Sequence, residues 1–389
     1  YESQGTALTS NVVGPFTSPG FYSFTAVAVL GSCTVSKTVF ITVIDADTCP
    51  PLTNRIYPNS QSWGSIITGG VTNAAAAIDQ NPQTFSTVTT GLGILGIGTT
   101  WQTIQWNHTI NAGTPVTVKL GSEYSGLTLA GAYSIVGTKR NSSGIPIDIG
   151  VIQPVSGTLL NLLPGQNIFE YTFIPSDNTG PKAYDGIRII VGSLVSIAQN
   201  VKVFEAYYKT PATAAVCNQN DVEDLYYGVI DLGIGALTTT VGVSDAYNAV
   251  DTNIDSYATM FSGTGILAAA DLTIAFKTPT LTGDKLEIIL SKPGSVLDLN
   301  LLSGFVIQPY LGNTPVGNPI NNTASILNLT LLNGGQRARL VIHTQNQIYD
   351  RVKIRFGGVA TVLNFLFVHD IKRTADTGVV GADVTNTIE

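Results

Sequence analysis

Charged residues are scarce in this sequence. Only 12% of its 389 residues are Asp, Glu, Lys or Arg, and the balance is acidic, with a formal net charge of −7. No run of lysine and arginine is present, so we expect no nucleic-acid partner. No apolar stretch reaches about 18 residues, so we expect no membrane insertion. The three cysteines and three histidines form neither a disulfide framework nor a histidine motif with metal-ligand or nucleophile spacing.

Small, polar and β-branched residues take the place of charge. The sequence contains 40 glycines, and Thr, Ser, Asn and Val are frequent around them. This composition disfavours helical bundles and favours sheets joined by many turns. Apolar residues alternate with polar ones, as in Val116, Val118 and Leu120, which indicates half-buried antiparallel strands. Few lysines and Thr/Asn/Gly-rich strands are also typical of an extracellular protein, so we expect that localisation.

The sequence contains an internal repeat. Three segments return in the same order, each pair at nearly the same separation: AIDQNPQTFSTV (77–88) as AVDTNIDSYATM (249–260), TIQWNHTINAGTPVTVKL (103–120) as TIAFKTPTLTGDKLEIIL (273–290), and YDGIRI (184–189) as YDRVKI (349–354). Three ordered matches are hard to obtain by chance, and they predict two homologous domains.

The fold class that we predict is all-β, with two antiparallel β-sandwich domains in tandem. We place the repeats at 48–211 and 212–375. About eight short strands in about 160 residues favour a jelly roll over an immunoglobulin-type sandwich, which needs only about 100. Residues 1–47 suggest two long strands and a turn, the C-terminal part of an Ig-like module. Residues 376–389 suggest a linker or the start of another unit, so we expect a fragment of a longer chain.

The frame A-[IV]-D-x-N-x-x-[TS]-[FY] resembles the calcium loop of discoidin-like (coagulation factor 5/8 C-type) jelly rolls, a fold common among carbohydrate-binding modules. The resemblance implies that calcium would be held by Asp79, Asn81 and Thr84 in the first copy and by Asp251, Asn253 and Ser256 in the second. It also implies a closing carboxylate near the last strand, for which the matching residues are Glu205 and Asp370.

This sequence departs from the family pattern at two places in the loop. Gln80 and Thr252 stand where the family has glycine, and the aromatic position is shifted to Phe85 or Tyr257. Oxygen donors of this kind suit Ca²⁺ if the chain curls around the ion. Asp and Asn two residues apart also form Asx-turns without any metal. The sequence leaves both alternatives open.

The ordered set of repeated segments, from the A-[IV]-D-x-N frame to the YDGIRI and YDRVKI segments, is similar to the repeats of large SprB-type surface adhesins of gliding Bacteroidota. The resemblance covers nearly the whole chain, from 1 to 375. It implies a secreted, non-enzymatic cell-surface protein that is exported by the type 9 system and works with the gliding and secretion machinery. The partners it implies are surface polysaccharides or abiotic surfaces.

Sugar binding requires exposed aromatic rings, and we rank Trp63 and Tyr227 first because both lie in polar, Gly-flanked settings. No residues form a catalytic motif, so we expect no enzyme activity. Two rival hypotheses remain open: tandem carbohydrate-binding modules of a polysaccharide-degrading enzyme, and a structural stalk without a ligand.

Overall fold

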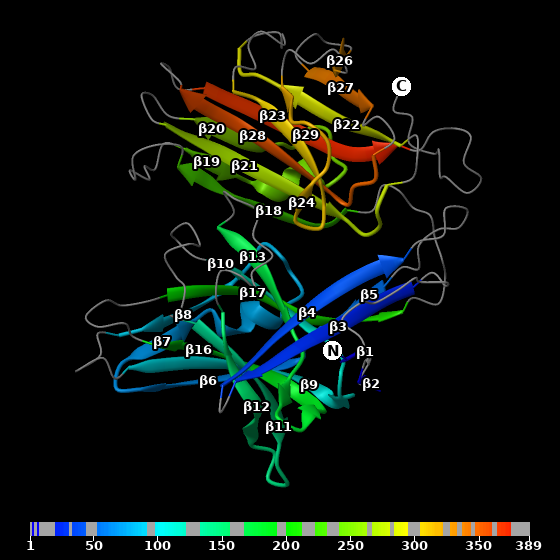
Figure 1. Ribbon diagram of the computed structural model, residues 1–389. Coiled ribbons are helices and arrows are strands. Elements are labelled where there is room, and N and C mark those ends of the chain that lie inside the picture. The colour runs from blue at the N-terminus through cyan, green and yellow to red at the C-terminus, as the bar shows by residue number, and fades with distance from the viewer. Residues whose placement is uncertain are drawn as a thin grey trace. The chain divides into compact units, whose positions relative to one another are not determined.

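The computed structural model describes the chain over eighteen ranges: 2–3, 6–7, 20–30, 33–43, 53–91, 98–121, 133–155, 167–192, 200–211, 222–231, 241–262, 267–280, 284–294, 304–321, 327–332, 337–343, 347–359 and 364–374 (Figure 1). The chain forms two compact units. Unit 1 contains Tyr1–Leu162 and Ile168–Ala214, and unit 2 contains Leu163–Asn167 and Ala215–Glu389. The main division falls between Ala214 and Ala215.

The N-terminal segment forms a small antiparallel sheet of four strands. Its main element is a hairpin of two long strands, β3 (Gly20–Leu30) and β4 (Cys33–Val43), as the sequence predicted. The short strands β1 (Glu2–Ser3) and β2 (Thr6–Ala7) complete it. The predicted Ig-like identity of 1–47 stays a prediction, and residues 376–389 lie outside the described residues.

Unit 1 contains two antiparallel sheets. The first has the spatial order β13 (Ile168–Phe173), β10 (Val116–Gly121), β17 (Asn200–Pro211), β8 (Ser86–Thr90), β7 (Gly69–Thr72), with β5 (Thr53–Ile56) also paired to β17. The second has the order β12 (Pro146–Pro154), β11 (Tyr133–Arg140), β16 (Tyr184–Gly192), β9 (Thr99–Ile110), β6 (Ser60–Ile66). A short separate hairpin joins β14 (Ser176–Asp177) to β15 (Gly180–Pro181).

Unit 2 also contains two antiparallel sheets. The first has the order β18 (Val222–Asp231), β21 (Leu267–Phe276), β28 (Arg351–Val359), β23 (Val306–Leu311), β24 (Thr314–Pro315), and β25 (Ile320–Asn321) pairs with β23. The second has the order β19 (Gly242–Ser244), β20 (Ala258–Ser262), β29 (Asn364–Thr374), β22 (Lys285–Ser291), β27 (Arg337–His343), β26 (Leu327–Leu331).

The spatial order of the strands is repeated between the units. β13-β10-β17-β8-β7 in unit 1 corresponds to β27-β22-β29-β20-β19 in unit 2, and β12-β11-β16-β9-β6 corresponds to β24-β23-β28-β21-β18. The segments that match in sequence occupy matching strands, so the internal repeat is a duplicated β-sandwich. The prediction of an all-β fold with tandem antiparallel sandwiches is confirmed.

Each unit has its own hydrophobic core, built by the predicted alternation. Ile104 and Trp106 in unit 1 are fully buried, as are their counterparts Ile274 and Phe276 in unit 2. Burying a side chain of this size contributes about 1.5–3 kcal/mol. Trp106 satisfies its indole N–H by donating to the carbonyl of Ile56 at 3.1 Å, which ties β5 to the core.

The repeated Tyr-Asp pair serves the same structural purpose in both units. Tyr184 lies edge-on to Trp106, and Tyr349 lies edge-on to Phe276, with ring centroids 6.4 Å apart in each case. The next residue in each copy, an aspartate, accepts a backbone N–H from a hairpin turn: Asp185 from Arg140 at 3.0 Å and Asp350 from Gly312 at 2.8 Å. The motif therefore fixes a core aromatic and a hairpin together.

Helical structure is limited to short 3₁₀ turns in the described part of the chain. η1 (Ala74–Ile78) occupies an Ala-rich segment, and η3 (Ala246–Ala249) is its counterpart in unit 2. Among the described residues, no helix has the length and apolar character needed to cross a membrane.

Candidate functional site

The repeated Asp-x-Asn loop occupies the same place in each unit. In unit 1 it joins η1 to β8, and in unit 2 it joins η3 to β20. Each helical turn begins with a residue in the left-handed region, Asn73 (φ 50°) or Asp245 (φ 51°). Both loops therefore enter and leave through equivalent local structure, and their side chains can be compared directly.

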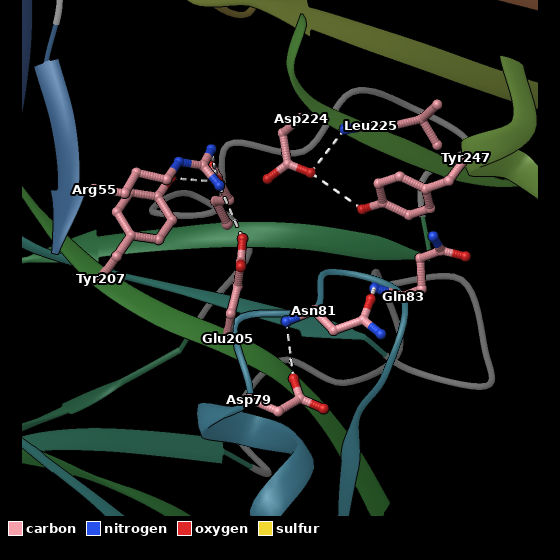
Figure 2. A network of polar contacts seen from close by, with 10 residues as sticks. Arg55, Asp79, Asn81, Gln83, Glu205, Tyr207, Asp224, Leu225 and Tyr247 are labelled. Atoms are coloured by element: carbon pink, nitrogen blue, oxygen red, sulfur yellow. Dashed lines mark hydrogen bonds and ion pairs between the residues drawn. The ribbon is translucent and has the colours of Figure 1, made fainter. Parts of the chain in front are cut away.

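The side chains of the first loop bind the loop itself. Asp79 accepts the backbone N–H of Asn81 through Oδ1 at 2.9 Å, and the hydroxyl of Thr84 through Oδ2 at 2.7 Å. Asn81 in turn accepts the backbone N–H of Gln83 through Oδ1 at 3.1 Å. Figure 2 shows the Asp79 and Asn81 contacts as two successive turns along the loop. The result is a pair of linked Asx-turns.

The second loop repeats this network. Asp251 accepts from the backbone of Asn253 at 2.9 Å and from the hydroxyl of Ser256 at 2.7 Å. Asn253 accepts the backbone N–H of Asp255 at 3.1 Å. The residues that the sequence grouped as candidates therefore do lie together within each loop.

The backbone conformation at Gln80 and Thr252 shows why the resembled family has glycine at this position. Gln80 has φ 60° and Thr252 has φ 65°, in the left-handed region that favours glycine. The turn geometry is therefore compatible with the glycine of the resembled family. In this chain a glutamine and a β-branched threonine adopt it at an energetic cost.

The proposed closing carboxylates are engaged elsewhere. Glu205 is only 2% exposed and its Oε1 accepts from Arg55 Nη1 at 2.9 Å. The guanidinium of Arg55 also lies 4.0 Å from the centre of the Tyr207 ring. In Figure 2 the Glu205 carboxylate points toward Arg55, whereas Asp79 is directed to Asn81.

Asp370 pairs with Lys372 at 3.5 Å. Burial raises the pKa of the Asp370 carboxyl, and Lys372 acts in the opposite direction. The ion pairs of the two carboxylates are therefore made with Arg55 and Lys372 rather than with the loops.

The carboxylate oxygens of Asp79 and of Asp251 accept hydrogen bonds from their own loops, which is the contact pattern of an Asx-turn. In the described part of the chain, no group of three or more His, Cys, Asp or Glu side chains is placed to hold a metal. The contacts favour the metal-free turn, and calcium stays a prediction for measurement in solution.

A β-bulge underlies each loop. Lys119 lies opposite Glu205 but Leu120 lies opposite Val203, so Phe204 is an extra residue in β17. The same shift in β29 makes His369 the extra residue. Sequence reasoning missed these bulges because a bulge changes register without leaving a clear sequence pattern.

The bulged residues contact the loops in different ways. Phe204 packs on Phe85, with ring centroids 5.2 Å apart. His369 instead donates from Nδ1 to the loop carbonyls of Ile254 at 2.9 Å and Ser256 at 3.0 Å. This fixes the tautomer of the neutral ring, so Nε2 accepts from Ser291, 2.7 Å away. Burial lowers the pKa of His369, and Arg337 adds to that effect.

The two aromatic candidates, Trp63 and Tyr227, occupy equivalent positions. Trp63 lies on edge strand β6 opposite Gln102, and Tyr227 lies on edge strand β18 opposite Leu272. The indole of Trp63 is 50% exposed. Tyr227 is partly buried and packs against the core of unit 2, so the expectation of a freely exposed ring is wrong for it. Ligand binding by either residue stays a prediction.

A buried polar cluster in unit 2 escaped the sequence analysis. Asp271 is completely buried, and it accepts two hydrogen bonds from Arg355 at 2.8 and 2.9 Å. Lys353 lies 3.7 Å from the same carboxylate. The one signal in the sequence was a lone aspartate in the otherwise uncharged strand LAAADLTIAF.

No protein-family model and no curated protein matches the sequence. Similar solved structures include the tandem CBM32-1 and CBM32-2 domains of Clostridium perfringens ZmpB, at 8% identity and a TM-score of 0.26, with 83% of this chain and 94% of that chain covered. The tandem CBM22-1-CBM22-2 domain of Paenibacillus barcinonensis Xyn10C matches at 10% identity and a TM-score of 0.20, covering 85% and 99%. A truncated AlyQ with CBM32 and alginate lyase domains matches at 9% identity and a TM-score of 0.24, covering 84% and 100%. Likenesses at this level carry no argument about function.

Proposed function

We propose that this chain is a non-catalytic part of a secreted, repetitive cell-surface adhesin that binds polysaccharide weakly through each of its two sandwich units. The observation that carries the proposal is the half-exposed indole of Trp63 on edge strand β6; a second aromatic residue, the partly buried Tyr227, stands at the equivalent position of β18. Two weak sites on one chain raise the apparent affinity because the second binding event becomes intramolecular.

Trp63 is suited to sugar stacking because its flat apolar ring is half exposed. The next residue, Gly64, lets the neighbouring Trp101 ring approach closely: a Cβ at Gly64 would lie 2.6 Å from that ring. Glycine is therefore required here by packing, and Trp101 lies on the neighbouring strand β9, on the opposite face of the sheet from Trp63.

The repeated carboxylates support the non-catalytic part of the proposal. Asp79 and Asp251 hold their own turns, Glu205 is paired with Arg55, and Asp370 with Lys372. A glycosidase needs two facing carboxyl groups that are available to the substrate. Surface localisation, type 9 export and a link to the gliding machinery belong to the same proposal and rest on the sequence resemblance.

The proposal is tested by polysaccharide binding of the whole chain, with affinity electrophoresis against a panel of neutral and acidic polymers. Trp63→Ala and Tyr227→Ala should each weaken retention, and the double variant should lose more than the product of the two single effects. Ile145→Ala is the matched control, because this residue is equally apolar and 59% exposed but lies in the turn before β12, at the other edge of the sheet from β6. Thermal melting checks that Tyr227→Ala is folded.

The outcomes separate the rival hypotheses. Broad, weak binding that depends on Trp63 supports the adhesin. Sharp specificity for one oligosaccharide favours a binding module of a polysaccharide-degrading enzyme. The absence of binding to every polymer, or equal loss in Ile145→Ala, contradicts the proposal and leaves the structural stalk.

A further inference from the structure

The outer face of the first sheet of unit 2 contains a pocket of about 170 Å³, which the aromatic sites do not use. Its lining comes from β23, β28 and the segment before β25: Val306, Gln308, Tyr310, Pro319, Lys353 and Arg355. A bound water requires only roughly 10–15 Å³, so the pocket has room for a carboxylate or sulfate group. The outward face of a sandwich sheet is ordinarily solvated, and a pocket with buried charges there is unusual.

Two cationic side chains line this pocket. Lys353 and Arg355 both contact the carboxylate of Asp271 beneath them. Lys353 is 5% exposed and Asp271 is fully buried, so water screens these charges little. An anion that enters the pocket would lie close to both cations with little screening.

One N–H donor group of Arg355 is available for such an anion. Arg355 uses Nε and Nη2 to bind Asp271, and its Nη1 makes no hydrogen bond in the part of the chain that the structure describes. The ammonium of Lys353 lies 5.3 Å from the centre of the Tyr310 ring. Cationic donors and an aromatic wall therefore line the same space.

Unit 1 shows that the fold does not need this cluster. By the strand correspondence, Trp101 stands in place of Asp271 and Ile190 in place of Arg355, and these two residues pair across β9 and β16 as Asp271 and Arg355 do across β21 and β28. The residue in place of Lys353 is Arg188, which pairs with Asp148 on β12. Buried ion pairs are seldom retained for stability alone, since apolar replacements serve as well.

We propose that this pocket binds the anionic group, carboxylate or sulfate, of an acidic sugar, with Lys353 and Arg355 holding the anion and Tyr310 forming the wall beside the sugar ring. The inference rests on the proposed function, because it takes the ligand to be a polysaccharide and adds its charge.

The test measures binding of a galacturonic-acid oligomer and of a sulfated galactan oligomer to the whole chain by titration calorimetry, with a neutral galactan oligomer as reference. Lys353→Gln should weaken binding of the preferred acidic oligomer by about tenfold, since it removes one charge-assisted contact. Lys353→Arg should restore it. Arg188→Gln, at the equivalent position of unit 1, is the matched control and should leave it unchanged.

A second measurement needs no variant, which covers the case that Lys353→Gln fails to fold. Binding of the acidic oligomer to the unmodified chain should weaken as sodium chloride is raised, because the contact is ionic. Salt-independent binding, equal binding by Lys353→Gln, or equal loss in Arg188→Gln overturns the pocket. Acidic oligomers that fail to bind while neutral polymers still bind through Trp63 overturn it too, but leave the proposed function standing. Failure of every polymer removes both.

Discussion

The same loop lies on different supports in the two units. In unit 1, Phe85 packs between the ring of Phe204 and the ammonium of Lys202, 4.7 Å from its ring centre. In unit 2 the equivalent Tyr257 stacks on Phe367 at 4.2 Å and lies edge-on to His369 at 5.3 Å. The hydrogen bonds inside the two loops are nevertheless identical in pattern and nearly identical in length.

This difference shows which part of the motif belongs to the fold. The Asx-turns depend on residues within five positions of one another, so the chain forms them on either support. The supporting residue differs between the units: it is Phe204 in unit 1 and His369 in unit 2. Only the histidine forms hydrogen bonds with the loop backbone. The following variants test how far each support stabilises its unit.

A spectroscopic difference allows the units to be followed separately. All three tryptophans, Trp63, Trp101 and Trp106, lie in unit 1. Tryptophan fluorescence therefore reports the unfolding of unit 1, whereas far-UV circular dichroism reports both units. Each comparison below uses urea unfolding followed by both signals.

The largest difference between the units in the free energy of unfolding is expected from variants that remove the partners of Glu205 and Asp370. Arg55→Ala leaves Glu205 buried without this ion pair and should lower the free energy of unfolding of unit 1 by about 3 kcal/mol. Lys372→Ala should cost unit 2 less, about 1–2 kcal/mol, because the Asp370 side chain is 14% exposed against 2% for Glu205, and Glu287, the other carboxylate that Lys372 contacts, keeps its pair with Arg339. Fluorescence should shift only for Arg55→Ala. Equal costs in the two units would contradict this account of the carboxylates.

The second-largest effect on stability is expected from exchanging the bulged residues that support the loops. His369→Phe removes the donor to two loop carbonyls and the partner of Ser291, and should destabilise unit 2 by about 2 kcal/mol. The reciprocal Phe204→His places a polar ring in an aromatic contact of unit 1, with a cost of similar size. If His369→Phe leaves the urea unfolding curve followed by circular dichroism unchanged, the histidine does not stabilise the loop.

Glycine at the left-handed positions should stabilise both units slightly. Thr252→Gly relieves a β-branched residue at φ 65° and should raise the stability of unit 2 by about 0.5–1 kcal/mol. Gln80→Gly should give unit 1 less, because glutamine is not branched at Cβ. The control is Gly113→Ala at φ 86°, which should destabilise unit 1 and so show that the assay resolves changes of this size and sign.

The acid response should distinguish the units further. The pKa of His369 is lowered below its ordinary value of 6.5 by burial, so the unfolded chain takes up the proton first. This histidine therefore contributes stability above pH 6.5, and the contribution is lost as the pH falls from 6.5 through the lowered pKa of the folded state. His369→Phe should flatten this part of the stability profile of unit 2. An unchanged slope in the variant would exclude His369 as its source.

Calcium should have the smallest effect. The oxygens of Asp79 and Asp251 already accept hydrogen bonds, so neither added calcium nor a chelator should move the melting temperature of either unit. Calorimetry is the measurement. A rise with calcium that Asp251→Asn abolishes would restore the metal-holding loop that the sequence left open.

Some structural features of this protein follow from local sequence, and others depend on tertiary structure. The repeat, the alternating strands, the 3₁₀ turn at Ala74–Ile78 and the grouping of Asp79, Asn81 and Thr84 follow from neighbouring residues, because their hydrogen bonds span at most a few positions. The glycine-like conformation at Gln80 was also signalled by the family pattern.

The partners of the buried charges depended on distant strands. Glu205 meets Arg55 across 150 residues, and Asp271 meets Arg355 across 84. Such pairs are fixed by ladder register and by bulges such as that at His369, where one extra residue redirects a side chain. The sequence therefore set the duplicated sandwich and its loops, while long-range strand pairing set which carboxylates are neutralised and where the pocket of unit 2 forms.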